Sequence, residues 1–135
     1  MSYDNPWLYF GIPFDKIPEK KIAFVYEITN KVNGRKYIGK KLFFFTKTKQ
    51  VKKKKKRVKS ESDWKSYYGS NKDLLTDVEK HGIESFERKI LKLCETKGTA
   101  NYWEMKYQIQ NEVLESDMWY NDWIMAKVHR SHIKS

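Results

Sequence analysis

Two tyrosines, Tyr26 and Tyr37, are the side chains whose type and spacing first indicate chemistry. They lie eleven residues apart, on either side of an Asn33-Gly34 dipeptide that is a strong signal for a hairpin turn. A phenol has a pKa of about 10, so it acts as a base only where a metal ion or another cation lowers that pKa. Without such a partner, the pair is an ordinary cross-strand aromatic contact.

The other reactive side chains favour structural roles. The sequence has no glycine-rich phosphate loop and no His-Glu-x-x-His pair. Its three histidines are His81, His129 and His132, and two of them lie in a polar C-terminal stretch. The single cysteine, Cys94, falls in a predicted strand, where a buried structural thiol is favoured over a nucleophile.

An antiparallel hairpin is expected to hold the two tyrosines. Residues 22–29 are rich in β-branched and aromatic side chains, which predicts a strand. Residues 35–40 predict the returning strand, and the apolar residues 42–45 are expected to extend a strand. The tyrosines therefore belong to neighbouring strands.

Two helices and a third strand are predicted after the hairpin. Residues 70–81 have a helical apolar face, with Ser70 as the cap and Gly82 as the end. Residues 86–93 predict the third strand, and residues 97–115 predict the longer helix, capped by Thr96 or Thr99.

This order predicts an α+β fold, in which a small antiparallel three-stranded sheet is flanked by helices. Residues 1–21 hold all three prolines and are expected to form an extended aromatic arm that covers an edge of the core or docks a partner. The domain itself is expected to span residues 22–124, with a basic insertion at 42–60 and a basic tail at 125–135.

The charge of the chain is strongly positive and concentrated. The 135 residues include 28 Lys or Arg against 17 Asp or Glu, which gives a formal net charge of +11. Thirteen of the basic residues lie between positions 35 and 59, where there is no acidic residue. Self-repulsion favours a mobile loop or the arms of an exposed ribbon there. A polyanionic partner is predicted, with nucleic acid first.

The candidate nucleic-acid contacts are the basic residues of this run, which would grip backbone phosphates without reading bases. They are Lys41, Lys47, Lys49, Lys52, Lys53, Lys54, Lys55, Lys56, Arg57 and Lys59. The alternatives are a nuclear-localisation patch, a solvated loop and a membrane-surface contact. No amphipathic anchor adjoins the run, so a membrane partner is not expected.

The compartment expected for the chain is a reducing, intracellular one. No apolar run approaches the length of a transmembrane helix, and the first residues lack the basic start and apolar stretch of a secretory signal. A single cysteine also excludes an internal disulfide.

Four features in the expected order resemble the GIY-YIG nuclease family. The tripeptide Phe-Val-Tyr that ends at Tyr26 and the tripeptide Tyr-Ile-Gly that begins at Tyr37 resemble the two motifs in the family's name. Glu104, within Asn-Tyr-Trp-Glu-Met-Lys, and Asn121, after Trp-Tyr, resemble its later carboxylate and asparagine. The resemblance covers residues 24–121.

A second set of residues resembles a subgroup of small phage-borne proteins with this fold. Residues 61–64, Glu-Ser-Asp-Trp, and residues 67–70, Tyr-Tyr-Gly-Ser, are similar to that subgroup, in which a basic insertion also follows Tyr-Ile-Gly-Lys-Lys. The resemblance implies a phage or mobile-element origin and the cytoplasm of a phage-infected or bacterial host. Trp64, Tyr67 and Tyr68 are expected to anchor the insertion to the core or to stack on bases.

The resemblance implies phosphodiester hydrolysis with one divalent cation. Glu104 would be the metal ligand for Mg²⁺, with Mn²⁺ as a substitute. Tyr26 or Tyr37 would orient or deprotonate the attacking water. Lys40 would neutralise charge on the transition state, and Asn121 would order the back of the site or contact a phosphate.

One position departs from the family pattern. Many members carry an Arg where this chain has Lys47, ten residues after Tyr37, often with a His one helical turn later. Lysine does not replace the bidentate phosphate contact of arginine. The role would pass to Lys40, Lys41, Arg57 or Lys59, or the activity would be weakened.

These features predict a Mg²⁺-dependent endonuclease that acts on double-stranded DNA, as a homing-type or DNA-processing nuclease. A homodimer that reads a short palindrome would instead indicate a restriction-like enzyme on the same fold. The remaining alternative is a catalytically silent nucleic-acid-binding protein on a nuclease scaffold.

Overall fold

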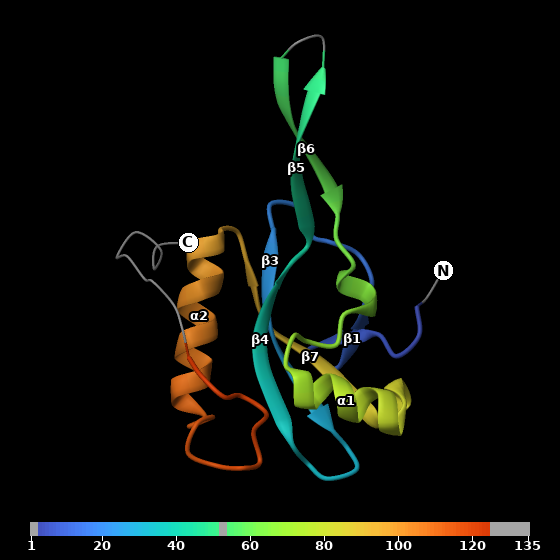
Figure 1. The fold of residues 1–135 in the computed structure, drawn as a ribbon, viewed down its shortest axis with the longest axis vertical. Coiled ribbons are helices and arrows are strands. Elements are labelled where there is room, and N and C mark those ends of the chain that lie inside the picture. Colours follow the sequence, from blue (N-terminus) through green and yellow to red (C-terminus); the bar gives the residue numbers. More distant parts are fainter. Residues whose placement is uncertain (1–2, 52–53, 125–135) are drawn as a thin grey trace.

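A five-stranded sheet forms the centre of the molecule (Figure 1). The computed structural model describes residues 3–51 and 54–124, and only the backbone within 47–51 and 54–58. The strand order is β2-β1-β7-β3-β4, with β1 and β7 parallel and the other neighbours antiparallel. The bounds are β1 Trp7–Tyr9, β2 Ile12–Phe14, β3 Ala23–Asn30, β4 Lys36–Leu42 and β7 Phe86–Cys94.

The α+β class is confirmed, but the expectation of three strands is wrong. The two additional strands, β1 and β2, lie inside the segment predicted to be an extended arm. Each has three residues, which is too short to show a strand period in the sequence. Pro13 is tolerated because β2 is the outermost strand, where a missing backbone N–H leaves no ladder bond unmade.

The predicted hairpin is confirmed as β3 and β4. Tyr26 pairs with Gly39 and Ile28 with Tyr37, so both tyrosines lie on the same face of the sheet, one diagonal step apart. The turn closes through bonds from Gly34 N to Asn30 O (2.7 Å) and from Asn30 N to Arg35 O (2.8 Å). Gly34 has a φ of +78°, a conformation that glycine adopts without strain.

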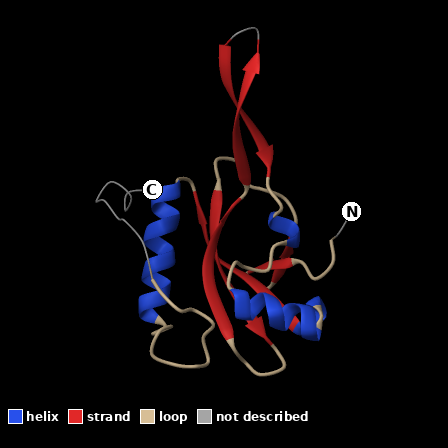
Figure 2. Cartoon of the chain, in the orientation of Figure 1, coloured by secondary structure: helices blue, strands red, loops and turns tan. Residues whose placement is uncertain are grey.

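Helices cover both faces of the sheet, so β3 is buried on both sides (Figure 2). On one face, Phe24 and Tyr26 join the larger core, together with Leu74 of α1. On the other face, Val25 joins a smaller core with Ala100 of α2. The helices are α1 Lys72–His81 and α2 Lys97–Gln110, and two short 3-10 turns are η1 Trp64–Ser66 and η2 Ile83–Ser85.

The helix ends differ from the predictions in two places. Asn71, not Ser70, caps α1, because its Oδ1 accepts from Leu74 N at 2.9 Å. Thr96 caps α2 as predicted, but this helix ends at Gln110 and not near residue 115. Glu112 has a φ of +53°, which turns the chain out of the helix.

The basic insertion forms a two-stranded ribbon that projects from the body of the molecule (Figure 1). Its strands, β5 Phe44–Val51 and β6 Lys54–Glu61, pair in continuous register from Phe44 opposite Glu61 to Val51 opposite Lys54. The two forms expected for this segment were a mobile loop and the arms of an exposed ribbon, and the structure has the ribbon. Lys52, Lys53 and the tail predicted for 125–135 lie outside the described residues.

Two further expectations concern single features. Cys94 is 1% exposed, and burial raises the pKa of its thiol to about 11, which confirms a structural role.

In the described part of the chain, neither helix has the length and apolar character needed to span a bilayer.

Candidate active site

The candidate site lies at the outer edge of β4, the last strand of the five-stranded sheet. Alternate residues of this strand point to opposite faces, so Tyr37 and Gly39 lie on the side of Tyr26, while Lys40 lies on the side of α2. Because β4 is the last strand of the sheet, side chains from both faces can meet at its edge. They do so around a pocket of about 200 Å³, lined by Tyr37, Lys40, Ser70, Glu104, Gln108, Asn121, Asp122 and Trp123.

Tyr26 lies behind this edge, with its ring over Gly39. The Tyr26 side chain is 1% exposed. A Cβ atom at position 39 would lie 2.5 Å from Tyr26 Oη and 2.9 Å from Tyr37 Cε2, so only glycine fits between the phenols. Burial raises the pKa of Tyr26 well above its ordinary value, and neighbouring Tyr67 raises it further. The neutral phenol is therefore the resting form.

Tyr37 reaches the pocket directly. Its Oη lies 3.3 Å from Ser70 Oγ, at hydrogen-bonding distance. Burial raises the pKa of Tyr37, although the bond with Ser70 opposes the shift. Ser70 is a site residue that the sequence analysis assigned to a helix cap. The only sequence signal for it was its place in the Tyr-Tyr-Gly-Ser segment.

Glu104 and Lys40 form an ion pair inside the pocket. Glu104 lies on α2, its side chain is 14% exposed, and its Oε1 is 3.4 Å from Lys40 Nζ. Burial raises the pKa of the Glu104 carboxyl, and Lys40 only partly offsets this. A desolvated carboxylate with one distant cation is thus available to a second, closer cation.

The oxygen donors at the pocket suit a hard divalent ion. Mg²⁺ is commonly held by one or two carboxylates and completes its shell with water, and Glu104 and Asp122 both line this pocket. Among the described residues, no three or more His, Cys, Asp or Glu side chains form a ready-made metal cage. The site therefore fits a water-rich Mg²⁺ or Mn²⁺ ion anchored by Glu104.

Asn121 fixes the edge of the sheet. Its Oδ1 accepts from Ile38 N at 3.1 Å and its Nδ2 donates to Ile38 O at 2.8 Å. Gln108 Nε2 donates to the same carbonyl at 2.9 Å. Asn121 thus bonds the edge of β4 in the way that a neighbouring strand would.

Tyr67 is a second residue that the sequence analysis did not place in the site. Its ring lies 6.0 Å from that of Tyr26 and nearly perpendicular to it. The two phenols also share a hydrogen bond, which contributes to the raised pKa of Tyr26. Gly69, at a φ of +93°, lets the loop that carries Tyr67 pack closely against Leu74. A Cβ at position 69 would lie 2.8 Å from Leu74 Cδ2.

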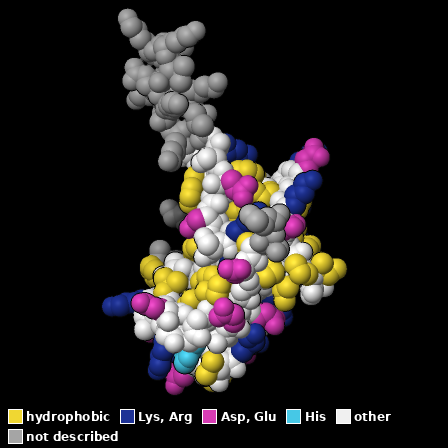
Figure 3. Space-filling model, turned by 90° about the vertical axis from the view of Figure 1, so that its right-hand side faces the viewer, with side chains coloured by type: hydrophobic (Ala, Val, Ile, Leu, Met, Phe, Trp, Pro, Cys, Tyr) yellow, Lys and Arg dark blue, Asp and Glu magenta, His cyan; other side chains and the backbone are white. Residues whose placement is uncertain are grey.

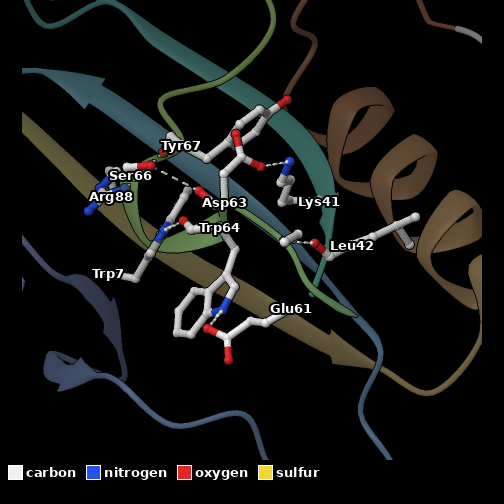
Figure 4. A network of polar contacts seen from close by, with 10 residues as sticks. Trp7, Lys41, Leu42, Glu61, Asp63, Trp64, Ser66, Tyr67 and Arg88 are labelled. Carbon is white, nitrogen blue, oxygen red and sulfur yellow. Dashed lines mark hydrogen bonds and ion pairs between the residues drawn. The ribbon is translucent and has the colours of Figure 1, made fainter. Parts of the chain in front are cut away.

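A buried arginine holds the Tyr67 loop in place. Arg88 donates to Tyr67 O at 2.8 Å (Figure 4). It also donates to Asn5 O at 2.6 Å. Its guanidinium lies 4.1 Å from the ring centre of Tyr68. Tyr68 and Trp64 are buried in the larger core, which agrees with their expected anchoring role.

Lys41 does not share the pocket with Lys40. Its Nζ lies 2.6 Å from Asp63 Oδ1 and 4.1 Å above the Tyr67 ring, and its side chain is 12% exposed (Figure 4). Lys41 lowers the pKa of Asp63 through this bond. A larger cavity of about 420 Å³, which Asp63 and Tyr68 help to line, includes none of the predicted catalytic residues.

Comparison with known proteins identifies the family. A family model described as "Putative endonuclease segE, GIY-YIG domain" matches residues 7–124. The chain belongs to the GIY-YIG nuclease family. This GIY-YIG chain is 34% identical over 99 residues to "Putative endonuclease segE" of Enterobacteria phage T4. The match covers 73% of the chain but only 39% of the phage protein. No solved structure matches the chain.

The missing family arginine can now be considered in this GIY-YIG domain. Of the four candidate replacements, Lys40 lines the pocket, and Lys41 is paired with Asp63. Lys59 is exposed, and its Nζ lies 4.5 Å from the ring centre of Phe44 on the ribbon. The side chains of Lys47, Lys49, Lys54, Lys55, Lys56 and Arg57 lie outside the described part of the structure.

Proposed function

We propose that the chain is a Mg²⁺-dependent endonuclease that hydrolyses phosphodiester bonds in double-stranded DNA, in a homing-type or DNA-processing role. The observation that carries this proposal is the pocket at the edge of β4, where a carboxylate, an ammonium group and a phenol converge. That combination suits a phosphate, a hydrated cation and an attacking water. The similarity to a protein described as a phage endonuclease supports it.

Each side chain of the pocket has a role in this reaction. Lys40 Nζ and Ser70 Oγ hold a non-bridging phosphate oxygen. When Lys40 contacts the phosphate, the negative charge of Glu104 is only partly neutralised by Lys40. Glu104 holds the Mg²⁺ ion, for which Mn²⁺ is the expected substitute. When bound, that ion polarises the phosphate and lowers the pKa of nearby water. Asn121 keeps β4 in place through Ile38.

The phenols supply the proton acceptor. Tyr37 Oη orients the attacking water at the pocket wall, and Tyr26 Oη lies behind it with Tyr67 as a neighbour. Burial holds the pKa of both phenols above its usual value, so neither ionises alone at neutral pH. A phenol accepts the proton of the attacking water only as a phenolate, so it must first release its own proton to solvent. Positive charge that enters the pocket beside Lys40 lowers the phenol pKa and favours that release.

The test is a plasmid-nicking assay at low salt with Mg²⁺, Mn²⁺ or EDTA. Glu104→Gln and Tyr37→Phe are expected to reduce nicking at least a hundredfold. The matched controls are Glu115→Gln, an exposed carboxylate beyond α2, and Tyr102→Phe on α2. Nicking that persists in EDTA, or that both active-site variants retain, contradicts the proposal.

A catalytically silent DNA-binding protein is the second candidate, because Lys47 stands at the family arginine position. In that case a gel shift is expected with no cleavage by the wild type in either metal. Glu104→Gln would then leave binding unchanged and there would be no cleavage to lose.

A further inference from the structure

An exposed tryptophan stands at the rim of the candidate active site. Trp123 is 68% exposed, although it lines the same pocket as Lys40 and Glu104. In contrast, Trp7 and Trp64 are fully buried in the core. An exposed indole at a pocket rim offers a ligand both a large apolar ring face and an N–H donor.

The backbone that leads to Trp123 is fixed by hydrogen bonds. Tyr120 N donates to Lys36 O at 2.7 Å, and Asn121 bonds Ile38 in both directions. Asn71 Nδ2 lies 2.8 Å from Tyr120 O and 3.3 Å from Asp122 Oδ2. The indole therefore extends from an anchored segment, and little freedom is lost when it contacts a ligand.

We propose that Trp123 stacks on the nucleobase next to the scissile phosphate, and that this base leaves the helical stack to reach it. The proposal rests on the proposed function, which places the phosphate between Lys40 and Ser70. The base attached to the neighbouring sugar then emerges at the pocket rim, where the indole offers its face.

A base inside a duplex is covered on both faces by its neighbours, so it can stack on protein only after it has unstacked. Unstacking is easiest at a mismatched or unpaired base. Stacking on an aromatic side chain tolerates every base, because each base has a π-face. The structure thus points to a nuclease that favours sites where one base is mismatched or unpaired. It does not point to recognition of one particular base type.

The experiment uses the full chain and duplexes in which a single mismatch is moved along the cleaved region. With the mismatch next to the cleaved bond, the wild type is expected to cut at least tenfold faster than on the paired duplex. Trp123→Ala should lose most of this enhancement, since stacking on an aromatic side chain contributes about 5- to 150-fold in binding. Trp123→Phe should keep most of it.

Phe10→Ala is the matched control, because Phe10 is 85% exposed and lies in the turn between β1 and β2. It should keep the full enhancement. Equal cutting of matched and mismatched duplexes by the wild type overturns the proposal, as does an enhancement that Trp123→Ala retains.

A second measurement separates this proposal from the proposed function. With 2-aminopurine at the scanned position and EDTA present, the wild type should change the fluorescence of the base on binding, and Trp123→Ala should not. If no protein cleaves any duplex in Mg²⁺ or Mn²⁺, the nuclease proposal fails. The fluorescence then decides the stacking proposal alone, and an identical change with both proteins overturns it.

Discussion

Gly39 is the residue on which the geometry of the tyrosines depends. Gly39→Ala would place a methyl group 2.5 Å from Tyr26 Oη, so at least one phenol must move. We expect a loss of cleavage of a hundredfold or more, with a loss of stability of about 1–3 kcal/mol from overpacking. Cleavage rates and urea unfolding measure the two effects.

Gly11→Ala is the control for this substitution. Gly11 has a φ of +79°, and nothing lies within 4 Å of a Cβ there, so alanine is strained but contacts no site residue. It should lower the unfolding free energy by about 1 kcal/mol and leave cleavage unchanged. Full activity of Gly39→Ala would show that the phenols need no fixed spacing.

The ionised carboxylate of Glu104 is predicted to destabilise the folded protein. Its pKa is raised by burial, so the folded state binds this proton more tightly than the unfolded state. The ionised form therefore destabilises the fold at pH values above the folded pKa, and the penalty disappears below the ordinary glutamate pKa of 4.5. Glu104→Gln should be more stable than the wild type at pH 7 while it loses cleavage.

Thermal unfolding between pH 4 and pH 8 measures this difference. The advantage of Glu104→Gln should shrink as the pH falls toward about 4, where both carboxyl and amide are neutral. In the wild type, cleavage should also fall with the pH as Glu104 becomes protonated. A variant that is less stable than wild type at pH 7 would mean that the pair with Lys40 outweighs desolvation.

At the scale of elements, the parts of the site that follow from local sequence could be predicted, and those that depend on tertiary contacts could not. The hairpin, the third strand and the two helices follow from turn signals, periodicity and caps. Tyr67 and Ser70 enter the site because Arg88 holds the Tyr67 backbone from another strand. No local pattern records that contact. Strands β1 and β2 were missed because three residues carry no period.

The ribbon is the element that we expect to carry DNA affinity. Lys49 lies opposite Lys56 in its register, a like-charged pairing that an anion would relieve. Each phosphate contact on duplex DNA contributes about −0.9 to the slope of log K against log salt. Replacement of Lys54, Lys55 and Lys56 by Gln should reduce the steepness of that slope by up to about 2.7.

Fluorescence anisotropy between 50 and 300 mM salt tests this prediction. The control replaces Lys16, Lys20 and Lys97 by Gln, which removes the same charge from exposed positions outside the ribbon. If both triple variants change the slope equally, net charge and not the ribbon determines affinity.

At the scale of the whole molecule, the positively charged ribbon follows β4, the strand that borders the candidate pocket, with one residue between the two strands. The residues outside 35–59 carry fifteen basic and seventeen acidic side chains. The face in Figure 3 shows both signs interspersed over the described part of the surface. The ribbon begins at Phe44, only four residues after Lys40. We therefore expect DNA that binds the ribbon to reach the edge of β4.

This connection predicts that binding and catalysis can be separated by removing the ribbon. Replacement of residues 47–58 by Asn-Gly would join Thr46 to Lys59, which are already paired in the register. It removes eight basic and no acidic residues, so the formal net charge falls from +11 to +3. The core should remain intact, because its described members Phe43 and Trp64 lie outside the deleted segment.

The shortened protein should unfold within a few degrees of the wild type, and its Kd for duplex DNA at 0.15 M salt should rise by about a hundredfold or more. Its maximal cleavage rate at saturating protein in low salt should stay within about threefold of the wild type, since the pocket is unchanged. A lost maximal rate with normal stability would mean that a ribbon side chain enters the site and takes the role of the family arginine. That outcome would assign the role to the ribbon and not to Lys40, whose Nζ lies 3.4 Å from Glu104 Oε1.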